Sequence, residues 1–275
     1  MKSFRKFLRN PTAVVGLTIL LFLILVALIG PFFVQDPLLQ QTAIKLRGPS
    51  AEHWLGTDDF GRDVLARIVV GAKYSLSAGL IAVALGLAGG LIMGAFAGYY
   101  GGLLDQIVMT LCDILLAFPS VLLAMGIVMV MEPGIYTPMI AVGISSMPTF
   151  ARLVRAQFLS LRTSSYIEAV RSSGAGDMRI IFRHLLPNSM GPIIIQATLR
   201  MGSAILLAAT LSFLGLGAQP PTPEWGSMLS FARNYIWTAP HLAIVPGVAI
   251  TLTVIAVNLI GDALRDFLDP RTRGA

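Results

Sequence analysis

The side chains that could bind a metal ion are few and scattered. The three histidines lie on three separate segments: His53, His184 and His241. A protein zinc site needs several such ligands around one point, and no cysteine lies beside any of these histidines. The acidic group of Asp58, Asp59 and Asp63 lacks the ligand spacing of a calcium-binding loop. We therefore expect no metal site within this chain, and we interpret the acidic group as a helix cap and the charged face of an external helix.

Patterns for nucleophilic or phosphate chemistry are missing from the sequence. It contains no GxxxxGK[ST] loop, whose backbone N–H groups and lysine hold ATP phosphates, and no GxSG serine motif. Cys112 is the only cysteine, so an internal disulfide is impossible, and its apolar surroundings indicate an ordinary buried thiol. We expect no catalytic residue and no cofactor in this chain.

The composition indicates a protein of the membrane. Hydrophobic residues make up 55% of the 275 residues and charged residues only 12%, whereas soluble domains carry about 25% charged residues. The charges are grouped, and long uncharged stretches separate the groups, which is typical of membrane spans. The net charge of +6 is not arranged as a basic stripe with interleaved aromatics, so we expect a lipid bilayer and no nucleic acid as a partner. The predicted fold class is an all-α integral membrane protein.

Six apolar stretches are long enough, at about 20 residues each, to cross the hydrocarbon layer. They cover roughly residues 13–33, 77–98, 104–131, 135–151, 191–216 and 242–261. The first stretch exceeds the roughly 7–15 residues of a signal-peptide core and has no small-residue cleavage site after it. We therefore interpret it as a retained anchor.

The distribution of Lys and Arg predicts the orientation of these spans. If both termini lie inside, the inner segments hold 13 of these residues and the outer segments hold six. Cytoplasmic segments carry such an excess, so we expect cytoplasmic N- and C-termini. The predicted organisation is an anchor helix (1–34), an extracytoplasmic connector with one helix (35–73), a transmembrane domain (74–262) that contains a cytoplasmic loop (160–187), and a cytoplasmic tail (263–275).

Small residues recur every four positions along the second span. The series begins with two alanines and continues as Gly86, Gly90, Gly94 and Gly98. In lipid, close backbone approach through small residues is a main source of helix association. This glycine stripe predicts a tight contact with a neighbouring helix, either within this chain or across a subunit boundary.

The cytoplasmic loop begins with signals for a short helix. Ser165 and Glu168 have the spacing of a capping box, in which each side chain bonds the other residue's free backbone N–H. Gly174 is expected to end this helix, because glycine enters the left-handed conformation without a Cβ clash.

A second short helix is expected directly after this turn. Asp177 can cap it, and four apolar residues are expected on one of its sides: Met178, Ile181, Phe182 and Leu185. Pro187 is expected to break the helix at the entrance to the fifth span. Two tethered helices of this kind form a compact knob that can transmit a push.

Two charges lie inside the predicted spans. Asp113 and Arg200 are about nine and ten residues from the cytoplasmic ends of their spans, a depth of about 15 Å for each. Charged groups at that depth are normally paired or face a cavity. Equal depth favours an ion pair between them, and contact with the termini of a substrate or separate solvation in a pore are the alternatives. Outside the membrane, we expect Trp225 to anchor at the interface, with contact to an external partner protein as the alternative.

Four stretches of the sequence carry a resemblance. Glu168-Ala169, Gly174 and Leu186-Pro187 have the spacing of the E-A-A-x3-G-x9-I-x-L-P loop, with Val170 and His184 as departures from it. Three other stretches read HWLGTDDFGRD from His53, SFLGLG from Ser212 followed by PEWG, and NLIGDALRD from Asn258. Together these stretches resemble the permease subunits of binding-protein-dependent ABC importers, in particular the C-type subunit of the peptide and nickel subgroup, and they cover about residues 50 to 270.

The resemblance implies a type I ABC importer fold and a set of partners in a bacterial inner membrane. These are a second permease subunit in a heterodimer, two ATPase subunits that bind ATP and magnesium, and an extracytoplasmic binding protein. It also implies that the loop of Glu168, Ala169, Gly174, Asp177, Leu186 and Pro187 sits in a groove of one ATPase subunit. Hydrolysis would then take place outside this chain, which is not expected to be an enzyme.

The resemblance leaves the substrate open among related solutes. Di- and oligopeptides are expected, with nickel, glutathione or a D-alanyl dipeptide as alternatives. A secondary transporter would show matching broken helices in two inverted halves, and no such internal match is present. An intramembrane protease would need a base on a span, and no histidine lies within the predicted spans.

Overall fold

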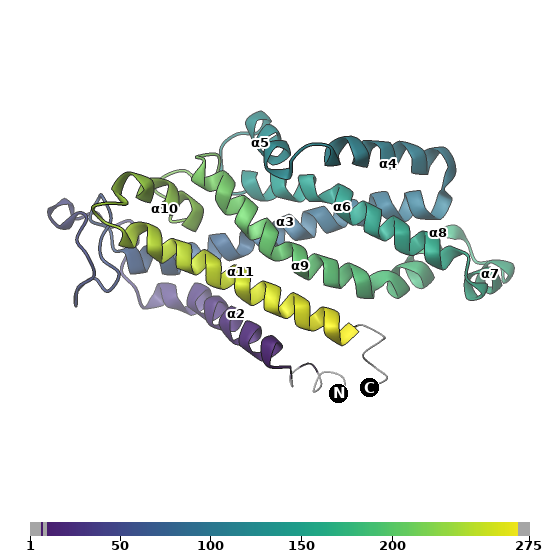
Figure 1. Cartoon of the computed structure of the whole chain (residues 1–275), viewed down its shortest axis with the longest axis horizontal. Coiled ribbons are helices and arrows are strands. Elements are labelled where there is room, and N and C mark those ends of the chain that lie inside the picture. Colours follow the sequence, from purple (N-terminus) through teal and green to yellow (C-terminus); the bar gives the residue numbers. More distant parts are fainter. Residues whose placement is uncertain (1–6, 8–9, 269–275) are drawn as a thin grey trace.

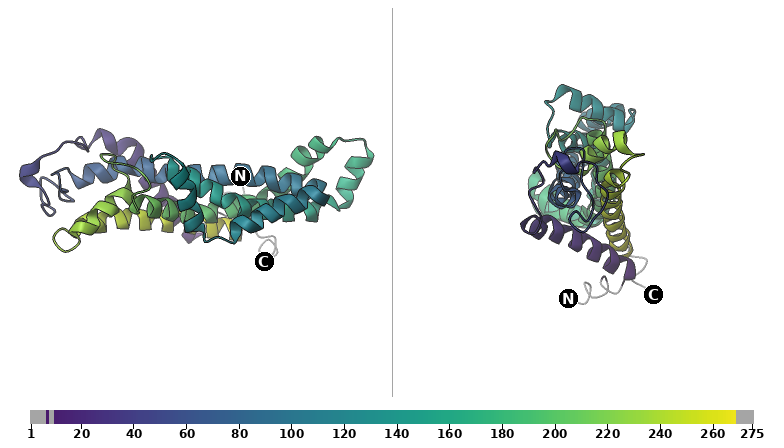
Figure 2. Two further views of the ribbon diagram at one scale, coloured as in Figure 1. Left: turned by 90° about the horizontal axis from the view of Figure 1, so that it is seen from above. Right: turned by 90° about the vertical axis from the view of Figure 1, so that its left-hand side faces the viewer.

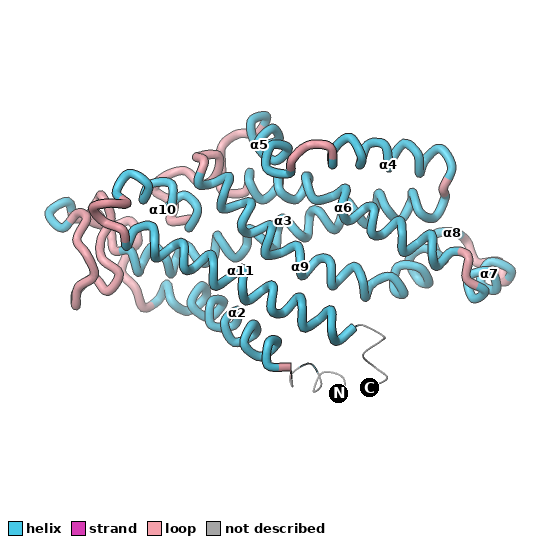
Figure 3. Tube along the Cα trace, in the orientation of Figure 1, coloured by secondary structure: helices cyan, strands magenta, loops and turns pink. Residues whose placement is uncertain are grey.

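The computed structural model of the protein describes residue 7 and residues 10–268 (Figure 1). Within these residues the chain is helical and forms no strand, as Figure 3 shows by colour. The predicted fold class is therefore confirmed. The basic residues expected to flank the first and last spans, Lys2, Arg5, Lys6, Arg9, Arg271 and Arg273, lie outside the described residues.

The first span is α2 (Pro11–Ile29), which continues into the short turn η1 (Gly30–Phe32). Asn10 caps α2 by accepting a hydrogen bond from the Thr12 N–H, and Pro11 occupies the first helical position, where its missing N–H costs nothing. At Gly16 the backbone of α2 comes close to the last long helix, α11 (His241–Leu268). The first span is thus part of the packed bundle.

The connector predicted over residues 35–73 contains one short 3-10 turn, η2 (Thr42–Ile44), and no separate α-helix. The helix expected there is the beginning of α3 (Val64–Tyr100), which starts well before the predicted boundary at residue 74. Asp63 caps α3 by accepting from the N–H of Ala66, so this part of the acidic group acts as the predicted cap. Asp58 lies in the turn before it, so the predicted charged helix face is wrong.

Three long helices form the centre of the bundle: α3, α6 (Thr137–Arg162) and α9 (Leu186–Phe213). Figures 1 and 2 show α3 and α6 lying side by side over most of their lengths. Their shared core is apolar and includes Ala82, Met139 and Phe150, which are almost completely buried. These three helices support the other elements of the bundle.

The third predicted span is not a single helix. It consists of α4 (Gly102–Leu116) and α5 (Ser120–Val130), which are bent by 97° at the break between them. Pro119 stands at this break, and a proline both lacks an N–H and disfavours the helical conformation of the residue before it. The prediction of an unbroken span over residues 104–131 is therefore wrong (Figure 1).

By length and apolarity, four helical segments of the described chain could each cross a membrane, and the bent pair gives a fifth. α6 is not among them. It is longer than the predicted fourth span, because it continues to Arg162 and so includes Arg152 and Arg155. Six spans in total stay a prediction.

The fifth span starts earlier than predicted. α8 (Asp177–Ile180), the π-helical segment η3 (Ile181–Leu185) and α9 follow one another without a break from residue 177 to 213. In a regular helix, the ring of Pro187 would clash with a carbonyl one turn earlier. The wider turn of η3, in which the Leu186 N–H donates to the Ile181 carbonyl, relieves this clash. The prediction that Pro187 breaks the helix is wrong.

The two ends of the molecule differ in character. α7 (Ser165–Ser172) and α8 project at one end, whereas the connector and α10 (Trp225–Ala232), followed by η4 (Arg233–Tyr235), lie at the other (Figure 1). The start of α2 and the end of α11 both point toward the end that carries α7. Both chain ends therefore lead to one side of the bundle, whereas their cytoplasmic location stays a prediction.

Candidate functional site

The knob formed by α7 and α8 is fixed to the bundle by buried apolar side chains. Ile167 of α7 and Ile180 of α8 are completely buried and belong to one cluster with Phe158 of α6. The Tyr99 hydroxyl at the end of α3 donates a hydrogen bond to Asp177 Oδ1 at 2.6 Å. The knob is thus tied to both α3 and α6, two of the three central helices.

The predicted caps of the two knob helices are shifted by one residue. Ser164, and not Ser165, is the N-cap of α7, and its carbonyl accepts from the Glu168 N–H, whereas no side-chain cap bond forms. Gly176, and not Asp177, is the N-cap of α8. Both predicted caps are therefore wrong, and the Asp177 carboxylate binds Tyr99 instead.

Gly174 ends α7 in the predicted way. Its φ of +82° is left-handed, its N–H donates to the Arg171 carbonyl, and the Ala175 N–H donates to the Val170 carbonyl. This pair of bonds is a Schellman motif, which satisfies the last free carbonyls of a helix.

The outward face of the knob combines acidic and apolar side chains. Glu168 and Ala169 are exposed, and Met178 and Phe182 are 48% and 60% exposed. The prediction that Met178 and Phe182 share one face with Ile181 and Leu185 is wrong, because the latter pair is buried. Leu186 is half-buried and Pro187 is exposed at the foot of the knob. The knob therefore offers apolar surface that water would not stabilise.

The glycine stripe of α3 lies against α6 of the same chain. A Cβ added at Gly98 would come within 2.8 Å of the Phe158 Cβ and within 2.9 Å of the Arg155 carbonyl oxygen. Gly86, Gly90 and Gly94 meet α6 in the same close way. The predicted tight contact of the glycine stripe is therefore made within this chain.

Asp113 does not pair with Arg200. Its carboxylate forms an ion pair with Arg152 of α6, and Asp105, two turns earlier on α4, binds Arg155 at 2.6 Å. α4 is antiparallel to α6 here, so both carboxylates reach arginines at the knob end of α6. The predicted pair between Asp113 and Arg200 is wrong because those residues face different neighbours.

Arg200 lines a cavity of about 490 Å³ between α3, α6, α9 and the bend that joins α4 to α5. Five hydroxyl side chains from α6 and α9 share its lining: Ser145, Ser146, Thr149, Ser203 and Thr210. Leu116 and Phe118 line it from the bend. Asp113 and Arg152 are each three residues, or one helical turn, from a residue that lines the cavity. Their ion pair therefore lies next to the cavity, on the side of the knob.

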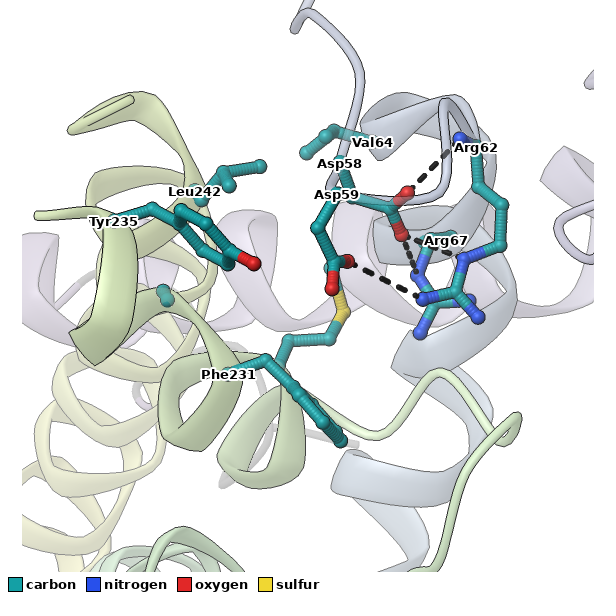
Figure 4. A pocket seen from close by; sticks show the side chains of 10 residues that line it. Asp58, Asp59, Arg62, Val64, Arg67, Phe231, Tyr235 and Leu242 are labelled. Atoms are coloured by element: carbon teal, nitrogen blue, oxygen red, sulfur yellow. Dashed lines mark hydrogen bonds and ion pairs between the residues drawn. The ribbon is translucent and has the colours of Figure 1, made fainter. Parts of the chain in front are cut away.

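An ionic cluster fixes the connector at the opposite end, where it borders a small pocket of about 30 Å³ (Figure 4). Asp58 binds the Arg62 Nε at 2.6 Å and lies 3.4 Å from the Arg67 Nε, while Asp59 faces Arg62 at 3.8 Å. Burial raises the pKa of Asp59 above its ordinary value, and Asp58 raises it further. The cluster joins the connector to the first turns of α3.

Glu224 and Trp225 are buried structural residues. Glu224 caps α10 by accepting from the N–H groups of Gly226 and Ser227, and its carboxylate also accepts from the Ser75 hydroxyl of α3. Burial raises the pKa of Glu224. Trp225 is only 1% exposed and donates from its Nε1 to the Ile68 carbonyl, so the prediction of an interfacial anchor is wrong.

No group of three or more possible metal ligands gathers within the part of the chain that the structure describes. His53 instead binds Asp63 at 2.8 Å, and His241 lies 3.5 Å from the Thr57 carbonyl oxygen. Sequence reasoning missed the roles of Arg152 and Glu224. The spacing of Glu224 before a helix start could have indicated its cap.

Residues 90–274 match the family described as the binding-protein-dependent transport system inner membrane component. The chain belongs to this family. Residues 2–49 match a second family, the N-terminal transmembrane domain of oligopeptide transport permease C. This permease is therefore a multi-pass protein of the bacterial inner membrane, and ATP hydrolysis resides in separate subunits of its ABC importer. Its partners include those ATPase subunits and a binding protein.

Two named relatives match most or nearly all of the permease. It is 48% identical over 99% of its length to the dipeptide transport system permease protein DppC of Alkalihalophilus pseudofirmus, of which 90% is covered. It is 52% identical over 82% of its length to the glutathione transport system permease protein GsiD of Pectobacterium atrosepticum, of which 75% is covered.

A solved structure shares the fold of this permease. A chain of the inward-facing MetNI methionine ABC transporter superposes with a TM-score of 0.60 at 20% identity, covering 74% of this permease and 96% of that chain. The predicted type I ABC importer fold is confirmed.

Proposed function

We propose that this permease moves di- and oligopeptides across the inner membrane, as one half of a heterodimer with a second permease subunit. The observation that carries the proposal is the cavity around Arg200. Its volume of about 490 Å³ falls within the roughly 300–1,000 Å³ of small-molecule sites. The names of the dipeptide and glutathione permeases, both similar along most of the chain, support the same substrate class.

The chemistry of the lining favours a peptide over nickel. Hydroxyl groups and one guanidinium suit the amides and the carboxylate of a peptide. Nickel prefers imidazole, thiolate or carboxylate ligands, and the residues that line this cavity include none of these. The nickel alternative therefore has no support from the cavity.

A heterodimer would complete the cavity. The lining comes from α3, α6, α9 and the bend, and the bend also presents exposed apolar residues such as Phe118, Leu122 and Val130. Apolar surface of this kind either faces lipid or packs against another subunit. In our proposal, the second permease subunit covers this face and closes the path.

We further propose that the knob is where two ATPase subunits, one on each permease, drive the cycle. The exposed residues Glu168 and Ala169 with Phe182 form its outward face, and Gly174 sets the turn between its helices. Asp177, Leu186 and Pro187 connect that face to α3 and α9. A partner that fits this face could push the central helices as a unit.

The experiment is uptake of a labelled tripeptide into vesicles that contain the complete transporter. Uptake should require ATP, the binding protein and the partner subunits. Ala169→Glu places a charge on the knob and should abolish uptake and the ATPase stimulation by the loaded binding protein. Ala51→Glu makes the same change at an exposed position of the outer connector and should leave both intact. Uptake by this permease alone, or normal coupling in Ala169→Glu, would contradict the proposal.

A further inference from the structure

Arg200 is a charged residue without a protein partner. The neighbouring charges of α4 and α6 are paired, with Asp113 bound to Arg152 and Asp105 to Arg155. No hydrogen bond or ion pair joins Arg200 to any residue that the structure describes. A lone charge inside a span is costly and marks a functional position by default, because the fold alone gains nothing from it.

Hydroxyl groups that line the cavity in front of Arg200 can form further hydrogen bonds. The hydroxyls of Ser145, Ser146 and Thr210 donate to carbonyls of their own helices at 3.0, 2.8 and 2.8 Å. Each hydroxyl oxygen still has lone pairs that can accept a hydrogen bond. The lining thus offers acceptors for N–H groups around one cation, which is the complement of a peptide end with its amides and its carboxylate.

An apolar hollow adjoins this polar cavity. It has a volume of about 570 Å³, is lined by residues such as Leu122, Leu123 and Ile127 of α5, and shares Phe118 with the polar cavity. A peptide whose carboxylate lies at Arg200 can therefore place an apolar side chain beyond Phe118, between this hollow and the second permease subunit that we propose to cover it. The two hollows together match a solute with one anionic end and variable side chains.

We propose that Arg200 binds the C-terminal carboxylate of the peptide during its passage and so sets the specificity of the membrane path. The proposal rests on peptide transport as the function of this permease. A guanidinium and a carboxylate can form two parallel charge-assisted hydrogen bonds, which makes arginine suited to this role. The site would select for the carboxylate within the membrane path itself.

The test compares a tripeptide with its C-terminal amide in vesicles that hold the complete transporter. Uptake of both is measured for the wild type, for Arg200→Gln and for Arg200→Lys. The binding protein can itself prefer the free acid, but this preference cancels when each variant is divided by the wild type for the same peptide. Arg200→Gln should reduce uptake of the free acid about tenfold more than uptake of the amide, and Arg200→Lys, which keeps the charge but loses the paired geometry, should retain part of the preference.

Equal losses for the acid and the amide in Arg200→Gln would overturn the proposal. If the binding protein delivers no amide, binding of both peptides to the detergent-solubilised complex without binding protein supplies the same comparison. Arg233→Gln removes an exposed arginine at the outer end and should change neither ratio. If the wild type takes up no peptide at all, peptide transport itself fails, and this outcome is distinct from a missing preference at Arg200.

Discussion

Replacing Gly94 by alanine would show how much the permease depends on the close approach of α3 and α6. The added Cβ would meet the Ala151 carbonyl oxygen first and the Val154 Cβ at 2.8 Å, whereas ordinary contact begins at 3.4 Å. The helices must therefore separate locally by at least about 0.6 Å, which forfeits about a quarter or more of the dispersion energy at the neighbouring contacts between them. Backbone atoms of α6 cannot rotate away to relieve the clash.

The magnitude follows from two opposing effects. Overpacking of a tight contact costs about 1–3 kcal/mol, while alanine is favoured over glycine within a helix by about 1 kcal/mol. The net destabilisation is up to about 2 kcal/mol. Gly191→Ala on α9 is the matched control, because nothing lies within 4 Å of its new Cβ. This control should be neutral or slightly stabilising.

The assay is the thermal unfolding midpoint of the complete complex in detergent, followed on this chain through a C-terminal fluorescent fusion. A loss of 2 kcal/mol corresponds to a decrease of about 4–8 °C for a chain of this size. Gly86→Ala should lie between the two variants, because the nearest atom to its new Cβ is the Ser146 hydroxyl oxygen, which can rotate away. If Gly94→Ala were as stable as Gly191→Ala, the close contact of the two helices would be refuted.

Three further perturbations address the ion pairs, the outer cluster and the knob. Asp113→Arg and Arg152→Asp should each lower the amount of folded permease recovered from membranes, because each leaves two like charges together. The double variant restores opposite charges and should restore this amount; a double variant that stays low would contradict the pairing. Because the folded-state pKa of Asp59 is raised, its ionisation destabilises the fold as pH rises above 3.8. Asp59→Asn should therefore raise the thermal midpoint at pH 7 but not at low pH. A gain in midpoint that is independent of pH would be inconsistent with this reasoning. Gly174→Ala, at φ +82°, should destabilise the turn by about 1–2 kcal/mol and speed hydrogen exchange in α7, whereas Gly176→Ala, at φ −71°, should not.

The apolar pattern of the sequence predicts most of the helices because membrane spans need long uncharged stretches. It did not reveal the bend between α4 and α5, since apolar residues flank Phe118 and Pro119 on both sides and a proline is also tolerated inside a continuous span. It also underestimated α6, whose arginines made its knob end look like a loop. Arg152 and Arg155 are tolerated there because carboxylates of α4 neutralise them, a contact between residues far apart in the chain.

Local signals predicted the knob only where one residue type is decisive. Gly174 was predictable because its left-handed conformation excludes most other residues. The caps were not, since Ser164 and Ser165 are both acceptable and packing of Ile167 decides between them. Pro187 was misread because a π-helical turn before a proline leaves no sequence signal.

The continuity of α8, η3 and α9 makes the knob and the cavity the two ends of one rod. From Asp177 to Arg200 there are 23 residues, or about 35 Å at 1.5 Å per residue. A rod of that length converts a tilt of about 5° at one end into a shift of about 3 Å at the other, which is the length of a hydrogen bond. A small rotation at the knob is therefore enough to make or break the polar contacts that Arg200 would form with a bound peptide.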